Sequence, residues 1–80
     1  MFYRYFDMSS GGSEKTDYSV IIIEADDESE ASSIFEERFE IDPYNTTCYC
    51  CGPDFSISEY VSIEDAREYS NPDRTAEYTK

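Results

Sequence analysis

The stretch YSVIIIEADDESEASSIFEERFE, residues 18–40, places a strong strand directly before a strong helix and decides the fold class. Its first part contains four consecutive apolar residues, Val20 to Ile23, so both faces of the strand are apolar. A strand of this kind lies in the middle of a sheet or is covered on both sides. The sequence therefore predicts a sheet built around residues 18–25.

The second part of the stretch predicts the main helix, over residues 27–40. Asp27 is a suitable N-cap residue, and Glu30 stands at the position of a capping-box partner. Apolar side chains recur at intervals of three and four residues and form one stripe, which consists of Ala31, Ile34, Phe35 and Phe39. Because a proline ring disfavours a helical residue ahead of it, the helix should end before Pro43.

The segments on either side of this stretch predict further strands and a second, shorter helix. Aromatic and β-branched residues indicate the strands, and a serine followed three residues later by an acid indicates the start of the helix. The predicted elements are strands at 1–8, before Gly52 and from Phe55 onward, and a helix at 63–69. Residues 71–80 show no hydrophobic period and are expected to form a loose C-terminal tail.

The predicted elements make a single α+β domain over residues 1–70. We expect a small, mostly antiparallel sheet of three to four strands, with both helices packed on one side of it. Eighty residues leave room for one domain with a small core. The eight tyrosines and five phenylalanines can fill that core, because each aromatic side chain buries a large area.

The net charge is the feature of the composition that bears most on function. Nineteen acidic residues against six basic ones give a formal charge of −13. Such a surface repels nucleic acid and anionic membranes and attracts basic surfaces. The alternative is that the charge only keeps the protein soluble or tolerant of salt.

The chain shows no sign of export. It has no basic segment followed by an apolar one at the N-terminus, and no apolar run approaches the roughly 20 residues that span a bilayer. We therefore expect an intracellular protein, in a compartment where cysteines stay reduced. We expect no enzyme, because the chain has no histidine to act as a base near neutral pH and no glycine-rich phosphate loop.

The three cysteines form a C-x-C-C cluster: Cys48, Cys50 and Cys51. A structural zinc ion needs four ligands, usually in pairs separated by two to four residues. The spacing and the lack of histidine argue against a metal, so we expect no cofactor and interpret the cysteines as small apolar residues in a hairpin. The alternative is a small zinc-binding structural or regulatory module that uses all three.

The main helix carries a run of acids that predicts a binding surface. Residues 24–42 contain nine acids against Arg38 alone. Side chains three or four residues apart on a helix lie about 5–6 Å from one another, and phosphates of one DNA strand recur every ~3.4 Å along the axis on a longer backbone path. Carboxylates here can therefore approximate a row of phosphates. The alternative is a solvated helix face.

The strands also predict a homodimer. One helix with a narrow apolar stripe covers a single face of the sheet, so the other apolar face should be exposed. An exposed apolar patch of this kind usually marks an interface, most often between two copies related by a two-fold axis. The predicted interface consists of Tyr3, Tyr5, Ile21 and Ile23, with the residues on the opposite face of the same strands as the alternative.

Residues 20–60, VIIIEADDESEASSIFEERFEIDPYNTTCYCCGPDFSISEY, resemble small uncharacterised bacteriophage proteins. In that family an I-E-A strand end and an acidic E-A-x-x-I-F-E helix precede a D-P-x-N-x-x-C-x-C-C-G-x-D-[FY]-S-I segment. The resemblance implies a phage origin and no particular chemistry. In size and charge the chain is also similar to anti-CRISPR proteins, many of which occupy the DNA-binding surface of a CRISPR effector.

These features predict a phage-encoded acidic inhibitor of a host defence complex. It would bind a basic DNA-binding surface, with a CRISPR effector as the expected target, by mimicking the charge of nucleic acid. The residues predicted to contact the partner are Glu30, Glu36, Glu37, Glu40, Tyr44 and Tyr60. Besides the zinc module, a phage regulator of a host polymerase or nuclease is an alternative.

Overall fold

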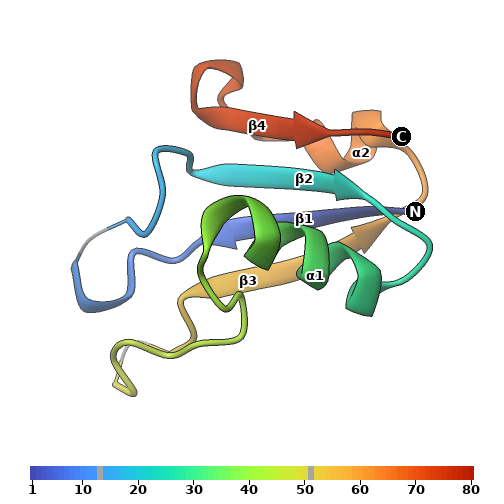
Figure 1. The fold of residues 1–80 in the computed structure, drawn as a ribbon. Coiled ribbons are helices and arrows are strands. Elements are labelled where there is room, and N and C mark those ends of the chain that lie inside the picture. Colours follow the sequence, from blue (N-terminus) through green and yellow to red (C-terminus); the bar gives the residue numbers. More distant parts are fainter. Residues whose placement is uncertain (13, 51) are drawn as a thin grey trace.

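The structure, a computed structural model, describes residues 1–12, 14–50 and 52–80. Four strands form one sheet in the order β3-β1-β2-β4, with a helix on each face (Figure 1). The elements are β1 (Phe2–Asp7), β2 (Val20–Glu24), α1 (Glu28–Phe39), β3 (Phe55–Tyr60), α2 (Ile63–Arg67) and β4 (Thr75–Tyr78). The predicted α+β class, with one main helix and one short helix, is confirmed.

The first face of the sheet is covered by α1. Phe35 lies at the centre of this core, with its ring 4.7 Å from that of Tyr5 and 5.0 Å from that of Phe55. Four residues of β1 and β2 lie in the same core, each at most 2% exposed: Tyr3, Tyr5, Ile21 and Ile23. The prediction that these four form a dimer interface is wrong, because one chain already buries them.

The second face of the sheet is covered by α2 and not left open. Ala66 and Ile63 of α2 pack against Val20 and Ile22 of β2. The prediction that both helices lie on one side is therefore wrong. Its physical cause is the apolar run in β2, since a strand that is apolar on both faces needs a cover on each.

The C-terminal residues form a fourth strand, so the prediction of a loose tail is wrong. β4 pairs parallel with β2, with Ala76 opposite Ile21 and Tyr78 opposite Ile23, which makes the sheet mixed. Ala76 is buried, and the ring of Tyr78 lies 5.9 Å from that of Phe39 on α1. These contacts hold the end of the chain against the core.

The cysteine segment forms a loop instead of the strand predicted before Gly52. The buried carboxylate of Asp54 organises this loop by accepting hydrogen bonds from the backbone nitrogen and hydroxyl of Thr47, both at 2.8 Å, and from the Asn45 amide at 3.2 Å. An isolated bridge between Cys48 and Gly52 is what the described residues retain of the expected hairpin. Cys51 lies outside the described residues.

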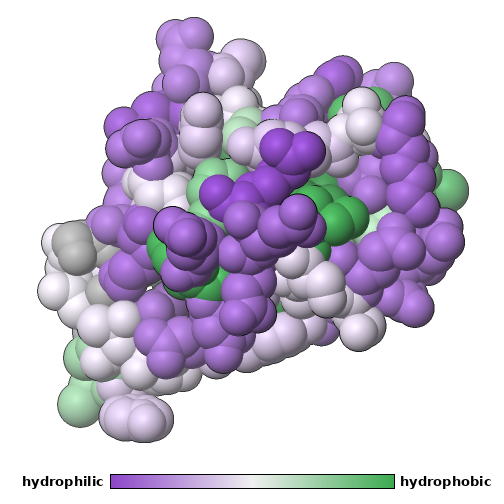
Figure 2. All heavy atoms as spheres, viewed as in Figure 1, coloured by the Kyte–Doolittle hydropathy of each residue, from purple (hydrophilic) through white to green (hydrophobic). Residues whose placement is uncertain are grey.

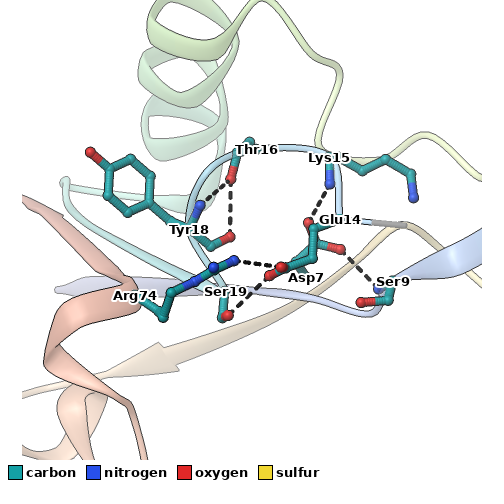
Figure 3. Close-up of polar contacts among 8 residues, drawn as sticks. All are labelled: Asp7, Ser9, Glu14, Lys15, Thr16, Tyr18, Ser19 and Arg74. Atoms are coloured by element: carbon teal, nitrogen blue, oxygen red, sulfur yellow. Dashed lines mark hydrogen bonds and ion pairs between the residues drawn. The ribbon is translucent and has the colours of Figure 1, made fainter. Parts of the chain in front are cut away.

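Two carboxylates hold the loop between β1 and β2 (Figure 3). Asp7 is buried and accepts hydrogen bonds from two backbone nitrogens of the loop, at 2.8 and 2.6 Å. Glu14 accepts a hydrogen bond of 3.0 Å from the hydroxyl of Ser19 and forms an ion pair with Arg74. Because Arg74 directly precedes β4, this ion pair ties the first loop to the last strand.

Candidate acidic binding surface

The position of α1 is fixed by its own first residues. Asp27 is the N-cap, and its carboxylate accepts a hydrogen bond of 2.8 Å from the backbone nitrogen of Glu30. The carboxylate of Glu30 accepts one of 3.3 Å from the backbone nitrogen of Asp26. The predicted N-terminus of the helix is confirmed, and the acids in its first turn suit the positive end of the helix dipole.

Three exposed carboxylates lie in one row along α1, and Glu37 lies outside this row, beside a pocket that Arg38 and Lys80 also line. Glu28, Ser32, Glu36 and Glu40 occupy one row at intervals of four residues, which spans about 18 Å at 1.5 Å per residue. Figure 2 shows hydrophilic residues over much of this face of the molecule. We call the following exposed carboxylates the acidic surface: Glu28, Glu36, Glu37, Glu40 and Asp42.

A chain of hydrogen bonds connects the acidic surface to the core. The hydroxyl of Tyr44 donates to Oε2 of Glu28 at 2.8 Å, which uses its only proton. The 2.8 Å contact between Tyr44 and Ser32 must then run from the serine hydroxyl, and the 2.9 Å contact between Ser32 and Tyr5 from the Tyr5 hydroxyl. One directed chain therefore leads from buried Tyr5 to exposed Glu28.

The two tyrosines of this chain stay protonated. Burial raises the pKa of Tyr5 to about 12, against the lowering effect of its hydrogen bond with Ser32. The hydrogen bond with Ser32 lowers the pKa of Tyr44, but burial and the hydrogen bond to Glu28 outweigh it, so that the pKa of Tyr44 is raised overall. Both hydroxyls remain donors at neutral pH, which keeps the chain directed toward Glu28.

The basic residues named here make their closest contacts with groups outside the acidic surface, although Arg38 is on α1 and lines a pocket with Glu37. Arg67 pairs with Glu77 at 2.6 Å, and Lys80 contacts Asp26 at 3.1 Å and Glu30 at 2.9 Å. The guanidinium groups of Arg4 and Arg38 lie 5.8 and 4.3 Å from the ring centroids of Phe6 and Tyr78. Among the residues that the structure describes, no ion pair includes a carboxylate of the acidic surface.

Four of the six predicted contact residues are exposed on α1 or directly after it: Glu36, Glu37, Glu40 and Tyr44. Glu30 is half-buried and bound to Lys80. Tyr60 lies on the opposite face of the sheet, packs in the α2 core and accepts a hydrogen bond of 3.4 Å from Arg4. Glu30 and Tyr60 are therefore not part of the acidic surface.

Two members of the acidic surface were not among the predicted contact residues. Glu28 could have been found from its spacing of eight residues to Glu36, which repeats the four-residue row. Asp42 gives no such signal, because it lies beyond the helix and is placed by a turn in which its carboxylate accepts a hydrogen bond of 2.9 Å from the backbone nitrogen of Tyr44.

The cysteine cluster is only partly visible in the structure. Cys50 is exposed and Cys48 is half-buried. Within the described residues, no three carboxylate, cysteine or histidine side chains lie together in a way that could hold a metal ion. Since Cys51 lies outside those residues, the C-x-C-C cluster as a whole is not placed.

Comparison of the chain with protein-family models, curated proteins and solved structures finds no match. The resemblance to small bacteriophage proteins therefore stays a prediction from the sequence. Within residues 1–12, 14–50 and 52–80, no helix has the length and apolar character needed to cross a membrane.

Proposed function

We propose that this protein is a phage-encoded inhibitor that binds a basic, DNA-binding surface of a host defence complex in the host cytoplasm. A CRISPR effector is the proposed target. The acidic surface makes the contact and excludes DNA by occupying the same lysines and arginines. The protein acts by binding alone, without catalysis.

The distribution of charge carries this proposal. The five exposed carboxylates of the acidic surface, on α1 and directly after it, take part in no ion pair within the described residues, while Arg67, Arg74 and Lys80 pair with other acids. Carboxylates four residues apart on a helix repel one another by about 0.2–0.5 kcal/mol per pair. A surface that carries this repulsion with no ion pair to offset it among the described residues is suited to a partner that supplies further bases.

Rigidity supports the same proposal. Tyr44 and Glu28 are held by the hydrogen-bond chain that ends on buried Tyr5, and the helix backbone fixes the spacing of Glu36 and Glu40. The fixed backbone and the bound Glu28 reduce the conformational entropy lost on binding, whereas the side chains of Glu36 and Glu40 must still be ordered. It also displaces the counterions of a basic groove much as a phosphate backbone does.

Charge reversal tests the proposal. The triple variant Glu36→Lys, Glu37→Lys, Glu40→Lys changes three exposed side chains for which no side-chain hydrogen bond or ion pair is found within the described residues. The matched control reverses three exposed acids elsewhere, Glu64, Glu68 and Asp73, and changes the net charge equally. Immobilised parent protein, triple variant and control are each incubated with a lysate of a CRISPR-bearing bacterium, and captured proteins are identified by mass spectrometry.

We expect the parent and the control to retain a CRISPR effector, and duplex DNA or about 0.5 M salt to release it. The triple variant should retain none. Purified effector should then lose DNA binding in the presence of parent protein. Equal capture by the triple variant would show that the acidic surface is only a solvated face. Capture of a polymerase or nuclease in place of an effector would show that the target is wrong.

A further inference from the structure

β3 forms an open edge of the sheet. Among the described residues it pairs with β1 alone, and Figure 1 shows no strand drawn beyond it. The backbone nitrogen of Met8 donates to the carbonyl oxygen of Asp54 at 2.9 Å. In an antiparallel pair, the backbone groups of every second residue bond to the neighbouring strand. Since Asp54 bonds to Met8 in this way, the backbone groups of the even-numbered residues of β3 point toward β1. The backbone groups that point outward belong to Phe55, Ile57 and Glu59.

This edge lacks the features that normally block strand addition. Protective edges are short, or carry several charges, a proline or a bulge. β3 has six residues, FSISEY, with one charge and no proline, and its register against β1 runs without interruption from Phe55 to Tyr60. β4, at the other edge, is four residues long, and its Glu77 is ion-paired with Arg67. Strand addition should therefore occur at β3.

We propose that two copies of this chain pair through antiparallel β3 strands, with the two-fold axis at Ser58. Ile57 of each copy then faces Glu59 of the other, and both residues exchange backbone hydrogen bonds. The two sheets become one sheet of eight strands. Since the axis is perpendicular to the sheet, both α1 helices and both acidic surfaces lie on the same face. This inference does not depend on the proposed function.

Three observations favour this register and this partner. Antiparallel pairing about Ser58 brings the outward-facing odd residues together, as backbone bonding requires. It places Glu59 opposite an isoleucine and not opposite the second Glu59. It also carries Val61, which is 80% exposed and follows β3 directly, to the start of the other copy's strand. The free backbone groups of β3 can hydrogen-bond to β3 of a second copy related by a two-fold axis, so a second copy of this chain is a suitable partner.

The charge of the chain sets the strength of this dimer. Edge pairing alone buries less than the roughly 1,200–2,000 Å2 of a standard interface, so association in the micromolar range or weaker is expected. Each chain carries a charge of −13, and the repulsion is screened by salt. Dimerisation should therefore strengthen with salt, whereas the proposed binding to a basic partner should weaken. The dimer and the binding to a basic partner can therefore be disproved independently of each other.

Sedimentation equilibrium of Ser58→Glu tests the interface, with Ser56→Glu as its matched control. Ser58 lies on the axis, so glutamates there meet directly; within one chain the new side chain faces Arg4, which favours folding. Ser56 is on the same face of the sheet and meets Tyr60 of the other copy. In about 0.5 M salt we expect the parent and Ser56→Glu to dimerise, and Ser58→Glu to weaken the dimer about tenfold or more.

A crosslink tests the register directly. In a background where Cys48, Cys50 and Cys51 are serine, Ser58→Cys should form a disulfide between copies, because facing residues at this position lie about 4.5 Å apart at Cα. Ser56→Cys should not. A parent mass of 9.3 kDa at about 200 µM, or crosslinking at position 56 but not at 58, would overturn the proposal. Retained folding is checked by circular dichroism.

Discussion

The hydroxyl of Tyr44 donates a hydrogen bond of 2.8 Å to the carboxylate of Glu28, sixteen residues earlier in the chain. This contact ties the segment after α1 back to the first turn of the same helix. It also connects the acidic surface to Ser32 and, through it, to buried Tyr5. An exposed tyrosine thus acts as a structural link as well as a candidate contact residue.

Tyr44→Phe should lower the free energy of unfolding by about 1–2 kcal/mol, because Ser32 loses an acceptor and Glu28 a donor. Urea denaturation followed by circular dichroism measures the change. Tyr49→Phe is the control, since Tyr49 is 90% exposed and its hydroxyl should contribute little. Equal stability of the two variants would show that the hydrogen-bond chain is not stabilising.

Asp54→Asn should destabilise the protein by about 2–4 kcal/mol, because the amide cannot accept all three hydrogen bonds that the buried carboxylate receives. Asp17→Asn, at an exposed position, is the control. Chemical denaturation at neutral pH separates them. A loss below about 0.5 kcal/mol for Asp54→Asn would mean that the loop does not depend on this carboxylate.

The same carboxylate predicts a loss of stability in acid. Burial raises the pKa of Asp54, but the hydrogen bonds from Thr47 and Asn45 outweigh it and hold the pKa below its ordinary value of 3.8. A lowered pKa stabilises the folded state above pH 3.8, and this contribution disappears as the pH falls further. Asp54→Asn should therefore flatten the dependence of stability on pH below about 4. An unchanged slope would contradict the assignment.

Tyr5 predicts the opposite behaviour in alkali. Its pKa of about 12 in the folded chain exceeds the ordinary value of 10.0, so the folded state keeps its proton longer than the unfolded state. Tyr5 should therefore lower the free energy of unfolding by about 2–3 kcal/mol as the pH rises from 10 toward 12. Tyr5→Phe should remove this contribution and leave that of Tyr44, whose pKa is also raised, whereas Tyr69→Phe, at a 95% exposed position, should leave the fall unchanged.

Purified protein should contain no stoichiometric zinc, because Cys50 is exposed and the chain offers no histidine as a further ligand. Elemental analysis after purification without chelator measures the content. Zinc near one equivalent per chain, together with unfolding on addition of EDTA, would instead support the alternative zinc module.

The elements with strong local signals were predictable from the sequence. The apolar run predicts β2 from a few adjacent residues, and the N-cap residue together with the apolar stripe predicts α1. β4 does not, because TAEY is four residues long and becomes a strand only by pairing with β2 from the other end of the chain. The strand expected before Gly52 does not form because Thr47 donates hydrogen bonds to the Asp54 carboxylate, which holds this segment as a loop.

The candidate site was predictable to the same extent. Helical spacing brings Glu36, Glu37 and Glu40 together without knowledge of the rest of the fold. Glu30 is not part of the acidic surface because it forms an ion pair with Lys80, and no local sequence pattern predicts that ion pair. Tyr60 is lost because its position in β3 directs it to the α2 face. Contacts between distant segments account for both differences.

The pairing of β4 with β2 has a consequence for how the chain matures. The hairpin of β1 and β2 can form early, since its residues are close in sequence, but the outer side of β2 stays unpaired until the last strand arrives. Such non-local pairing slows folding, and an apolar strand edge that is still unpaired is prone to aggregate. Aggregation during folding is therefore expected to begin before β4 has paired with β2. Removal of residues 75–78 would leave the outer edge of β2, a central strand of the sheet, unpaired.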